Sequence, residues 1–366
     1  MKKILVVSNM YPSEKFPFYG IFVKRFCDQL DTLGIMYDLS VMHKGSSKFE
    51  KIRNYIAFYF GTFFKCLFGK YERVYVHYAS YSTPSVLFAR KIKNFNLIIN
   101  AHGSDVVPEN SKHERMQKYT KRAFNIADRI VVPSEYFKAL IEEKYQLNRD
   151  KIFVYPSGGV DFNVFRPLEN EEEKFKILRE FGLDKNKKHI GYVGRMSSGK
   201  GWLTFIDGVA RVLEKNNEIE VVIAGDGPEA ATIVQEIKNK NLEKRVVRLP
   251  LLSQEQLSKL YRILDIFVFP TERAGESLGL VAIEAMASGA VVIASDYAAP
   301  KYYIQDQVNG YKFDMGNSLD CESQILNYIQ LNTIKQQQIR NNSMKTAQNY
   351  SSKKVRNILL RVINDL

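Results

Sequence analysis

The sequence predicts an α/β protein of two similar domains, each a parallel sheet with helices on both faces. The first observation is length, because 366 residues exceed what one ordinary hydrophobic core holds. The second is a repeated alternation of short apolar runs with longer helical patterns. The third is that the apolar runs lack period-two alternation and end at turn residues, which is typical of parallel strands buried on both faces. Because the alternation occurs twice, we expect two Rossmann-like, doubly wound domains.

The first half of the chain supplies six strands to this prediction. The opening stretch, "MKKILVVSNMYP", has a basic start but only a short apolar run, so it predicts a first buried strand rather than a signal peptide. The predicted strands are 3–9, 37–42, 73–79, 96–103, 129–134 and 152–158. Helical patterns between them include 20–33, 113–126 and 134–145.

The second half repeats the pattern after a break. Gly158, Gly159 and Pro167 interrupt any regular element, and an acidic run follows them. We therefore expect domains at 1–165 and 166–350. The second-half strands are predicted at 189–194, 221–227, 246–250, 265–271 and 290–296, and its helices at 202–215, 229–240, 254–263 and 279–288.

Composition narrows the class of protein and its partners. Three cysteines, odd in number and far apart, favour a reducing, cytoplasmic compartment without a disulfide framework or zinc spacing. The net charge is +13, and residues 1–165 carry 25 Lys+Arg against 15 Asp+Glu. A basic first half indicates an anionic partner. We expect no nucleic-acid partner, because no RNA-recognition, zinc-finger or helix-turn-helix signature accompanies the charge.

The stretch "ERAGESLGLVAIEAMASG", residues 272–289, contains the most informative pair of charges. Glu284 lies within an apolar helical pattern, and a buried carboxylate is costly without partners. Gly275 and Gly279 would let a ligand approach the helix N-terminus, where unpaired N–H groups favour phosphate. The hydroxyls of a sugar or ribose would be good partners for Glu276 and Glu284. The alternative is that Glu284 faces solvent and Glu276 only favours the helix dipole.

A series of motifs, in order along most of the chain, resembles the retaining nucleotide-sugar glycosyltransferases of the GT-B fold, glycosyltransferase family 4 (group 1). "ESLGLVAIEAMASG" resembles the family's signature of two Glu residues separated by seven others. The remaining motifs are "SNMYPSEKFPFYGIFVKRFCDQL", "AHGSD", "ADRIVVPSE", "YPSGGVDFNVFRP", "GYVGRMSSGKG", "VVIAGDGPE", "LYRILDIFVFPTE" and "GAVVIASD". The resemblance implies two Rossmann-like domains facing a cleft, with a last helix, about 351–366, crossing back to the first domain.

The resemblance also implies catalytic roles for four residues. Arg195 and Lys200 would neutralise the donor diphosphate, as a planar fork and a point charge. Glu276 would hold hydroxyls of the transferred sugar, and His102 would lie near its reacting carbon. The alternative for Arg195 and Lys200 is that both are solvated surface cations. The alternative for His102 is a purely structural role.

Further positions carry over as donor-binding residues. Glu284 would hold the ribose hydroxyls. The remaining donor-binding positions are Gly20, Gly194, Ser277, Leu278, Gly279 and Leu280. His77 and Asp105 are candidates for contacting the acceptor or orienting His102, and the resemblance leaves open which. Two cations replace a metal at the diphosphate in this family, so we expect no metal and no cofactor beyond the donor substrate.

The implied function is transfer of a hexose-type sugar, with retention, from a nucleotide-sugar donor to a glycan or lipid-linked acceptor of a bacterial surface polysaccharide. A GT-B nucleotide-sugar epimerase and a non-catalytic nucleotide- or glycan-binding protein are the alternatives. There are departures from the family's pattern: "FYGIFV" has one glycine where relatives have more, Ser157 replaces a usual Asn, and Ser277-Leu278 stands where Phe is common. These departures bear on donor identity more than on the reaction.

Residues 51–74, "KIRNYIAFYFGTFFKCLFGKYERV", combine aromatic residues with flanking cations. Such a helix can lie in the interface of an anionic bilayer. We therefore expect a cytoplasmic protein with peripheral contact to the inner face of the membrane. A core helix packed on the sheet with basic ends in water is the alternative.

Overall fold

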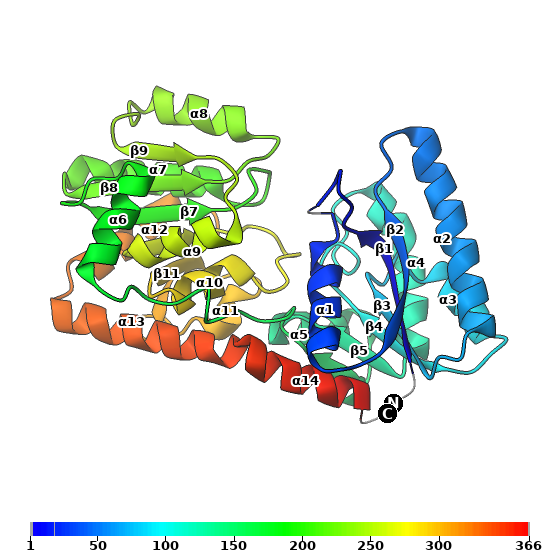
Figure 1. Cartoon of the computed structure of the whole chain (residues 1–366). Coiled ribbons are helices and arrows are strands. Elements are labelled where there is room, and N and C mark those ends of the chain that lie inside the picture. Colours follow the sequence, from blue (N-terminus) through cyan, green and yellow to red (C-terminus); the bar gives the residue numbers. More distant parts are fainter. Residues whose placement is uncertain (1–2, 18, 365–366) are drawn as a thin grey trace. The chain divides into compact units, whose positions relative to one another are not determined.

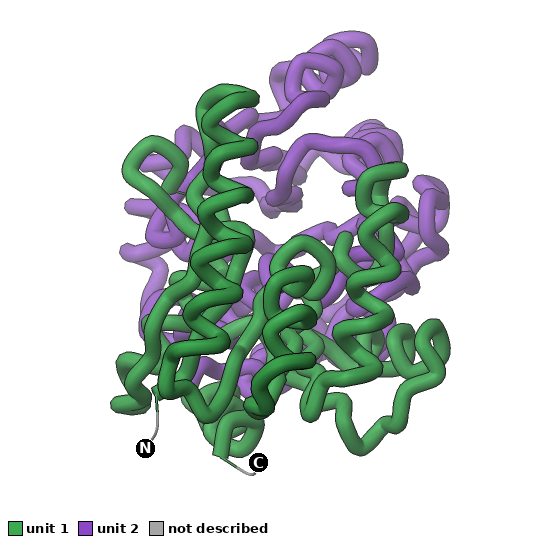
Figure 2. Tube along the Cα trace, turned by 90° about the vertical axis from the view of Figure 1, so that its right-hand side faces the viewer, with its two compact units in different colours: residues 1–158, 353–366 green, residues 159–352 purple. Residues whose placement is uncertain are grey.

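The computed structural model describes residues 3–17 and 19–364, and the chain divides into two compact units. Unit 1 runs to Gly158 and resumes at Lys353, and unit 2 is Gly159–Ser352 (Figure 2). Each unit contains one six-stranded sheet, and every strand pair in both sheets is parallel. The predicted pair of doubly wound domains is confirmed.

The sheet of unit 1 has the strand order β2-β1-β3-β4-β5-β6. Its strands are β1 (Ile4–Tyr11), β2 (Tyr37–His43), β3 (Arg73–His77), β4 (Asn96–Asn100), β5 (Arg129–Val132) and β6 (Ile152–Val154). Successive side chains enter opposite cores, with Leu5 and Val7 on one face and Ile4 and Val6 on the other.

Helices cover both faces of this sheet (Figure 1). α1 (Ile21–Thr32) and α14 (Ser352–Asn364) pack on one face. The other face carries α2 (Lys48–Phe68), α3 (Pro84–Arg90), α4 (Ser111–Ile126) and α5 (Glu135–Tyr145). The guanidinium of Arg129 donates to the carbonyls of Arg361 and Val362, 2.8 Å each, and so fixes the end of α14 to the sheet.

The sheet of unit 2 has the order β12-β11-β10-β7-β8-β9. Its strands are β7 (Lys188–Val193), β8 (Ile219–Ala224), β9 (Val246–Leu249), β10 (Ile266–Phe269), β11 (Val291–Ser295) and β12 (Gly310–Phe313). The sequence prediction omits β12. This edge strand is four residues long and includes Lys312, so it has no apolar run of the kind that marks the other strands.

The helices of unit 2 flank this sheet. Their bounds are α6 (Glu171–Phe181), α7 (Trp202–Lys215), α8 (Ala230–Asn239), α9 (Gln254–Ile263), α10 (Leu280–Ala287), α11 (Pro300–Tyr303), α12 (Ser318–Ile329) and α13 (Thr333–Ala347). Two 3-10 turns, at Arg149–Lys151 in unit 1 and Gln348–Tyr350 in unit 2, complete the regular structure. α7, α8 and α12 share one core with the sheet, and α10 contacts α9 and α13.

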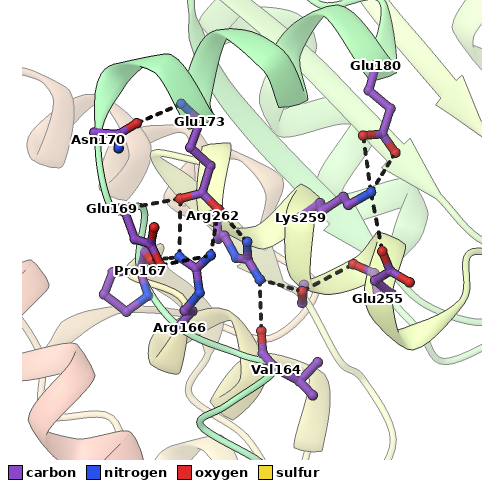
Figure 3. Close-up of polar contacts among 11 residues, drawn as sticks. Val164, Arg166, Pro167, Glu169, Asn170, Glu173, Glu180, Glu255, Lys259 and Arg262 are labelled. Atoms are coloured by element: carbon purple, nitrogen blue, oxygen red, sulfur yellow. Dashed lines mark hydrogen bonds and ion pairs between the residues drawn. The ribbon is translucent and has the colours of Figure 1, made fainter.

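The segment 159–165 belongs to unit 2, so the division falls before the predicted boundary at residue 165. The amide of Val160 donates to Tyr350 O at 2.8 Å, and Phe165 packs on Tyr261. Glu173 then anchors the segment, accepting from Arg166 at 2.8 Å and from Arg262 at 2.6 Å (Figure 3). These contacts attach the first residues after the glycine pair to α6 and α9.

Two further observations concern the length of the helices and the state of the cysteines. No helix within residues 3–17 and 19–364 is both long and apolar enough to cross a bilayer. Cys27, Cys66 and Cys321 are buried free thiols.

Candidate active site

Three neighbouring strands of unit 2, β7, β10 and β11, end at the same edge of the sheet because they are parallel. The loop 194–201 follows β7 and the loop 270–279 follows β10. The backbone joins these two loops directly, since the amide of Glu272 donates to Gly199 O at 2.9 Å. Ligands of doubly wound sheets bind at this carboxyl edge.

Glycines bring these loops into contact. At Gly201, where φ is +68°, a Cβ would lie 1.7 Å from the carbonyl oxygen of Pro270. At Gly225, where φ is +129°, a Cβ would lie 2.1 Å from Gly194 O. The loop 194–201 is therefore held between the residues that follow β8 and β10, at distances that a side chain would prevent.

Lys200 and Glu276 form an ion pair between the two loops. Their Nζ–Oε2 distance is 2.6 Å, and the side chains are 18% and 14% exposed. Thr271 Oγ1 lies 3.4 Å from the same carboxylate oxygen. Arg195 is exposed, and in the described parts of the chain its guanidinium makes no ion pair. One cation of the loop is thus held by Glu276 and the other faces solvent.

The helix α10 begins where this pair lies. Gly279 is its N-cap in the left-handed region, and a Cβ there would lie 2.8 Å from the ring of Phe269. Ser277 is half-buried and Leu278 is buried. Glu284, in the middle of the helix, is 6% exposed. The alternative that Glu284 faces solvent is therefore wrong.

Two tyrosines that the sequence did not single out lie beside these loops, since a Cβ at Gly194 would lie 3.4 Å from Tyr192 Oη and one at Gly279 would lie 3.0 Å from Tyr303 Oη. Tyr192, in β7, and Tyr303, in α11, are buried. Burial raises the pKa of both phenols, followed by the charge of Glu276 for Tyr192, and by Tyr350 and then Glu276 for Tyr303. Neither hydroxyl has a hydrogen-bond partner among the residues that the structure describes. Buried hydroxyls are normally satisfied, so these two are unusual. The approach of Tyr303 depends on tertiary packing, which no local pattern reports.

In unit 1, the histidines His77 and His102 come together at the ends of β3 and β4. His77 Nδ1 lies 3.0 Å from His102 Nε2. Phe22 packs on the His102 ring with centroids 4.3 Å apart, and Phe26 on the His77 ring at 4.5 Å. Burial lowers the pKa of His102 to about 4 and holds that of His77 well below its ordinary value, so both rings are neutral at pH 7.

Asp105 holds the loop that carries His102. Its carboxylate is fully buried and accepts from the amides of Ala79, His102 and Gly103 at 2.8 to 3.0 Å. These bonds fix the backbone of the loop, and the imidazole of His102 instead contacts His77. The geometry thus favours an orienting role for Asp105 over direct contact with an acceptor.

Gly20 is the N-cap of α1, with φ at +74°. A Cβ there would lie 2.5 Å from the carbonyl carbon of Met10 near the end of β1, so glycine permits this close approach.

The structure thus places Gly20, His77, His102 and Asp105 in unit 1. It places Gly194, Arg195, Lys200, Glu276, Ser277, Leu278, Gly279, Leu280 and Glu284 in unit 2.

The helix α2 has one face on the core and one in solvent. Phe58, Thr62 and Cys66 are buried, so the alternative of core packing holds for this face. Large apolar side chains at helical spacing are 50 to 76% exposed along the other side: Phe49, Ile52, Ile56, Phe60, Phe64 and Phe68. We call these six residues the α2 stripe. Arg73, one of the cations within the stretch 51–74, is buried and pairs with Glu72.

Among the described residues, no three His, Cys, Asp or Glu side chains gather in a way that could hold a metal ion.

Sequence profiles match both units. The profile described as "Glycosyltransferase Family 4" matches residues 41–161, and "Glycosyl transferases group 1" matches 173–346. D-inositol 3-phosphate glycosyltransferase of Mycolicibacterium smegmatis is 31% identical over 210 residues, which is 55% of this chain and 45% of that protein. Alpha-monoglucosyldiacylglycerol synthase of Streptococcus pneumoniae is 27% identical over 197 residues, 53% of this chain and 44% of that protein. The chain thus matches less than half the length of these two relatives.

Solved structures match over the full length. Anabaena HepE, crystallised in complex with UDP-glucose, aligns over all of both chains with a TM-score of 0.77 and 17% identity. The two six-stranded parallel units are thus the Rossmann-like domains of the GT-B fold. With the two profiles together matching most of the sequence, the chain belongs to the group 1 glycosyltransferases, family 4.

The close contact at Gly201 makes a testable prediction about stability. Gly201→Ala should destabilise unit 2 by about 2 kcal/mol or more beyond Gly182→Ala, because the new methyl group overlaps the Pro270 carbonyl. Gly182 is a matched control, with the same φ of +68° and no atom within 4 Å of its would-be Cβ. Urea unfolding followed by the fluorescence of Trp202, the single tryptophan, measures both. Equal midpoints for the two variants would contradict the close contact.

The contact between His77 and His102 makes a prediction about pH. The folded-state pKa of His102, about 4, lies below the ordinary 6.5, so its contribution is present above pH 6.5 and is lost as the pH falls toward 4. His102→Gln should therefore lose less stability than the wild type between pH 7 and about 4.5. Urea midpoints by circular dichroism measure this, with the exposed His43→Gln as the control. A wild-type pH dependence retained in His102→Gln would refute the assignment.

Proposed function

We propose that the chain is a retaining glycosyltransferase that moves a hexose-type sugar from a nucleotide-sugar donor to a glycan or lipid-linked acceptor of the bacterial cell surface. The observation that carries the proposal is the ion pair of Lys200 with Glu276 beside the loop that leads into α10, with Arg195 exposed on the same loop as Lys200. Two cations and a helix N-terminus suit a diphosphate, and a carboxylate suits sugar hydroxyls. The relatives and the UDP-glucose complex of HepE support this class of substrate.

Each group of unit 2 has a proposed role in the reaction. Arg195 and Lys200 stabilise the charge that develops on the departing diphosphate, and Glu276 positions the transferred sugar. Glu276 is already paired with Lys200, which suits positioning better than covalent attack. We propose that the departing phosphate oxygen takes the acceptor proton on the same face, which retains the anomeric configuration. Glu284 holds the ribose hydroxyls, and two cations supply the charge that a metal would otherwise bring.

Hexose transfer is tested by release of nucleoside diphosphate from UDP-, GDP-, ADP- and dTDP-sugars. The wild type should release product from one donor, and Arg195→Ala and Glu276→Ala should lower the rate roughly 100-fold, the size of effect seen when one charge-stabilising group is removed. Arg179→Ala and Glu172→Ala are matched controls on the exposed face of α6. Undiminished release in the Arg195 and Glu276 variants would overturn the proposal.

The unpaired hydroxyl of Tyr303 gives a second test of the donor site. Tyr303→Phe should leave the urea midpoint unchanged or raise it, because a buried hydroxyl without a partner costs stability. The same variant should weaken binding of the donor nucleotide about 5-fold, the value of one hydrogen bond. Calorimetric titration measures the affinity, with the neighbouring, exposed Tyr302→Phe as control. An unchanged affinity in Tyr303→Phe would remove Tyr303 from the donor site.

We further propose that the protein contacts an anionic membrane surface through the α2 stripe. An exposed apolar row is unusual on a protein surface and typical of interfacial helices. Arg53 and Lys70 are exposed cations at its ends. They would face anionic headgroups while the aromatic side chains enter the interface.

Co-sedimentation with vesicles tests this contact. The wild type should bind vesicles of phosphatidylglycerol mixed with phosphatidylcholine at low salt, and less at high salt because charge is screened. Ile56→Ser with Phe60→Ser should reduce binding about 10-fold through lost apolar burial. Leu319→Ser with Ile334→Ser, two exposed apolar residues of unit 2, is the matched control. No binding of the wild type at low salt would exclude a membrane contact.

A further inference from the structure

Unit 1 contains a pocket that none of the roles above uses. Its volume is about 510 Å³, within the range that holds small ligands. Asn9 and Met10 from the end of β1 form one side. The N-terminal half of α2 and the start of α4 close it on two others. The pocket therefore opens at the carboxyl edge of the sheet, where His77 also lies.

Four tyrosines give this pocket an aromatic wall: Tyr55, Tyr59, Tyr78 and Tyr81. The rings contact one another, with centroids of Tyr55 and Tyr59 5.7 Å apart and those of Tyr78 and Tyr81 6.2 Å apart. The hydroxyl of Tyr59 donates to Tyr81 O at 3.0 Å, which holds the wall in place. Rigid aromatic faces suit the apolar C–H face of a sugar ring.

The charges that line the pocket are all of one sign. Lys51 and Lys112 reach it, together with His113, and no Asp or Glu is among the described residues that line it. Burial lowers the pKa of His113, so the two lysines carry the charge at pH 7. Neither lysine forms an ion pair within residues 3–17 and 19–364. Unpaired cations beside an aromatic wall favour an anionic ligand.

The pocket also adjoins the histidine pair. Tyr78 directly follows His77 and has φ at +68°, a left-handed conformation that is strained for a bulky residue. Its hydroxyl lies 2.6 Å from Ser104 Oγ, two residues beyond His102. Strain of this kind occurs where a side chain is held for function. Tyr78 thus connects the wall of the pocket to the loop that carries His102.

From this geometry we propose that the pocket binds the acceptor, and that the acceptor is a saccharide carrying a phosphate or carboxylate group. The tyrosines receive the sugar ring, Lys51 and Lys112 receive the anionic group, and the end that reacts points toward His102. This assignment rests on the proposed glycosyl transfer, and it adds the chemical class of the acceptor.

Ligand-observed saturation-transfer NMR tests the proposal on the full-length protein. The probes are glucose 1-phosphate, glucuronate, methyl α-glucoside and inorganic phosphate. The two anionic sugars should bind at least 5-fold more tightly than either the neutral glucoside or phosphate alone, because only they use both parts of the pocket. Equal binding of the neutral and anionic sugars, or of phosphate and glucose 1-phosphate, would overturn it.

Charge reversal locates the binding. Lys112→Glu should weaken glucose 1-phosphate at least 5-fold, whereas Lys121→Glu, also exposed on α4 but outside the pocket, should not. Tyr81→Leu should weaken both anionic sugars and leave inorganic phosphate unchanged. Equal effects of the two lysine variants would refute the pocket as the site.

Binding of nucleoside diphosphate to unit 2, measured on the same samples, separates this proposal from the proposed function. Nucleotide binding without anionic-sugar binding would refute the acceptor class alone. Loss of nucleotide binding in the wild type would instead refute the donor site.

Discussion

The ion pair of Lys200 with Glu276 joins the two loops on which the proposed donor site depends. It is possible because Gly201 brings its backbone against the carbonyl of Pro270, a distance that any side chain would increase. The strand order also brings the loops together, because β7 and β10 are neighbours and their loops follow at the same edge of the sheet. A diphosphate arriving there would compete with Glu276 for Lys200, and the released carboxylate would meet the sugar. Binding of the diphosphate and positioning of the sugar would then result from the same exchange, in which Lys200 leaves Glu276 for the diphosphate.

In unit 1, a buried carboxylate positions the loop that carries His102. The carboxylate of Asp105 accepts hydrogen bonds from three backbone amides, and the rings of His77 and His102 contact each other. Burial keeps both imidazoles neutral, so a proton there would be costly. These rings therefore suit hydrogen bonding and shape better than proton transfer at neutral pH. This agrees with a reaction in which the donor's own phosphate accepts the proton.

The sequence predicted most of the strands and helices and singled out the charged residues of the loops 194–201 and 270–279, but it did not predict what surrounds those residues. Buried parallel strands leave an apolar run, and the spacing of Glu276 and Glu284 forms a motif, so both are local signals. Tyr192 and Tyr303 lie far apart in sequence, and their approach to Glu276 comes from tertiary packing alone. The sequence prediction missed β12 because an edge strand needs no apolar run. For α2, the pattern left two alternatives, and the structure shows a buried face and an exposed one on the same helix.

Hydrogen exchange measured with and without a saturating nucleoside diphosphate tests the donor site most directly. Our account predicts slower exchange at the amides of 194–201 and 276–284, because the ligand contacts one loop and the N-terminus of α10. Exchange in α8, on the outer part of the same unit, should not change. Protection confined to other segments, with 194–201 and 276–284 exchanging as before, would contradict the account.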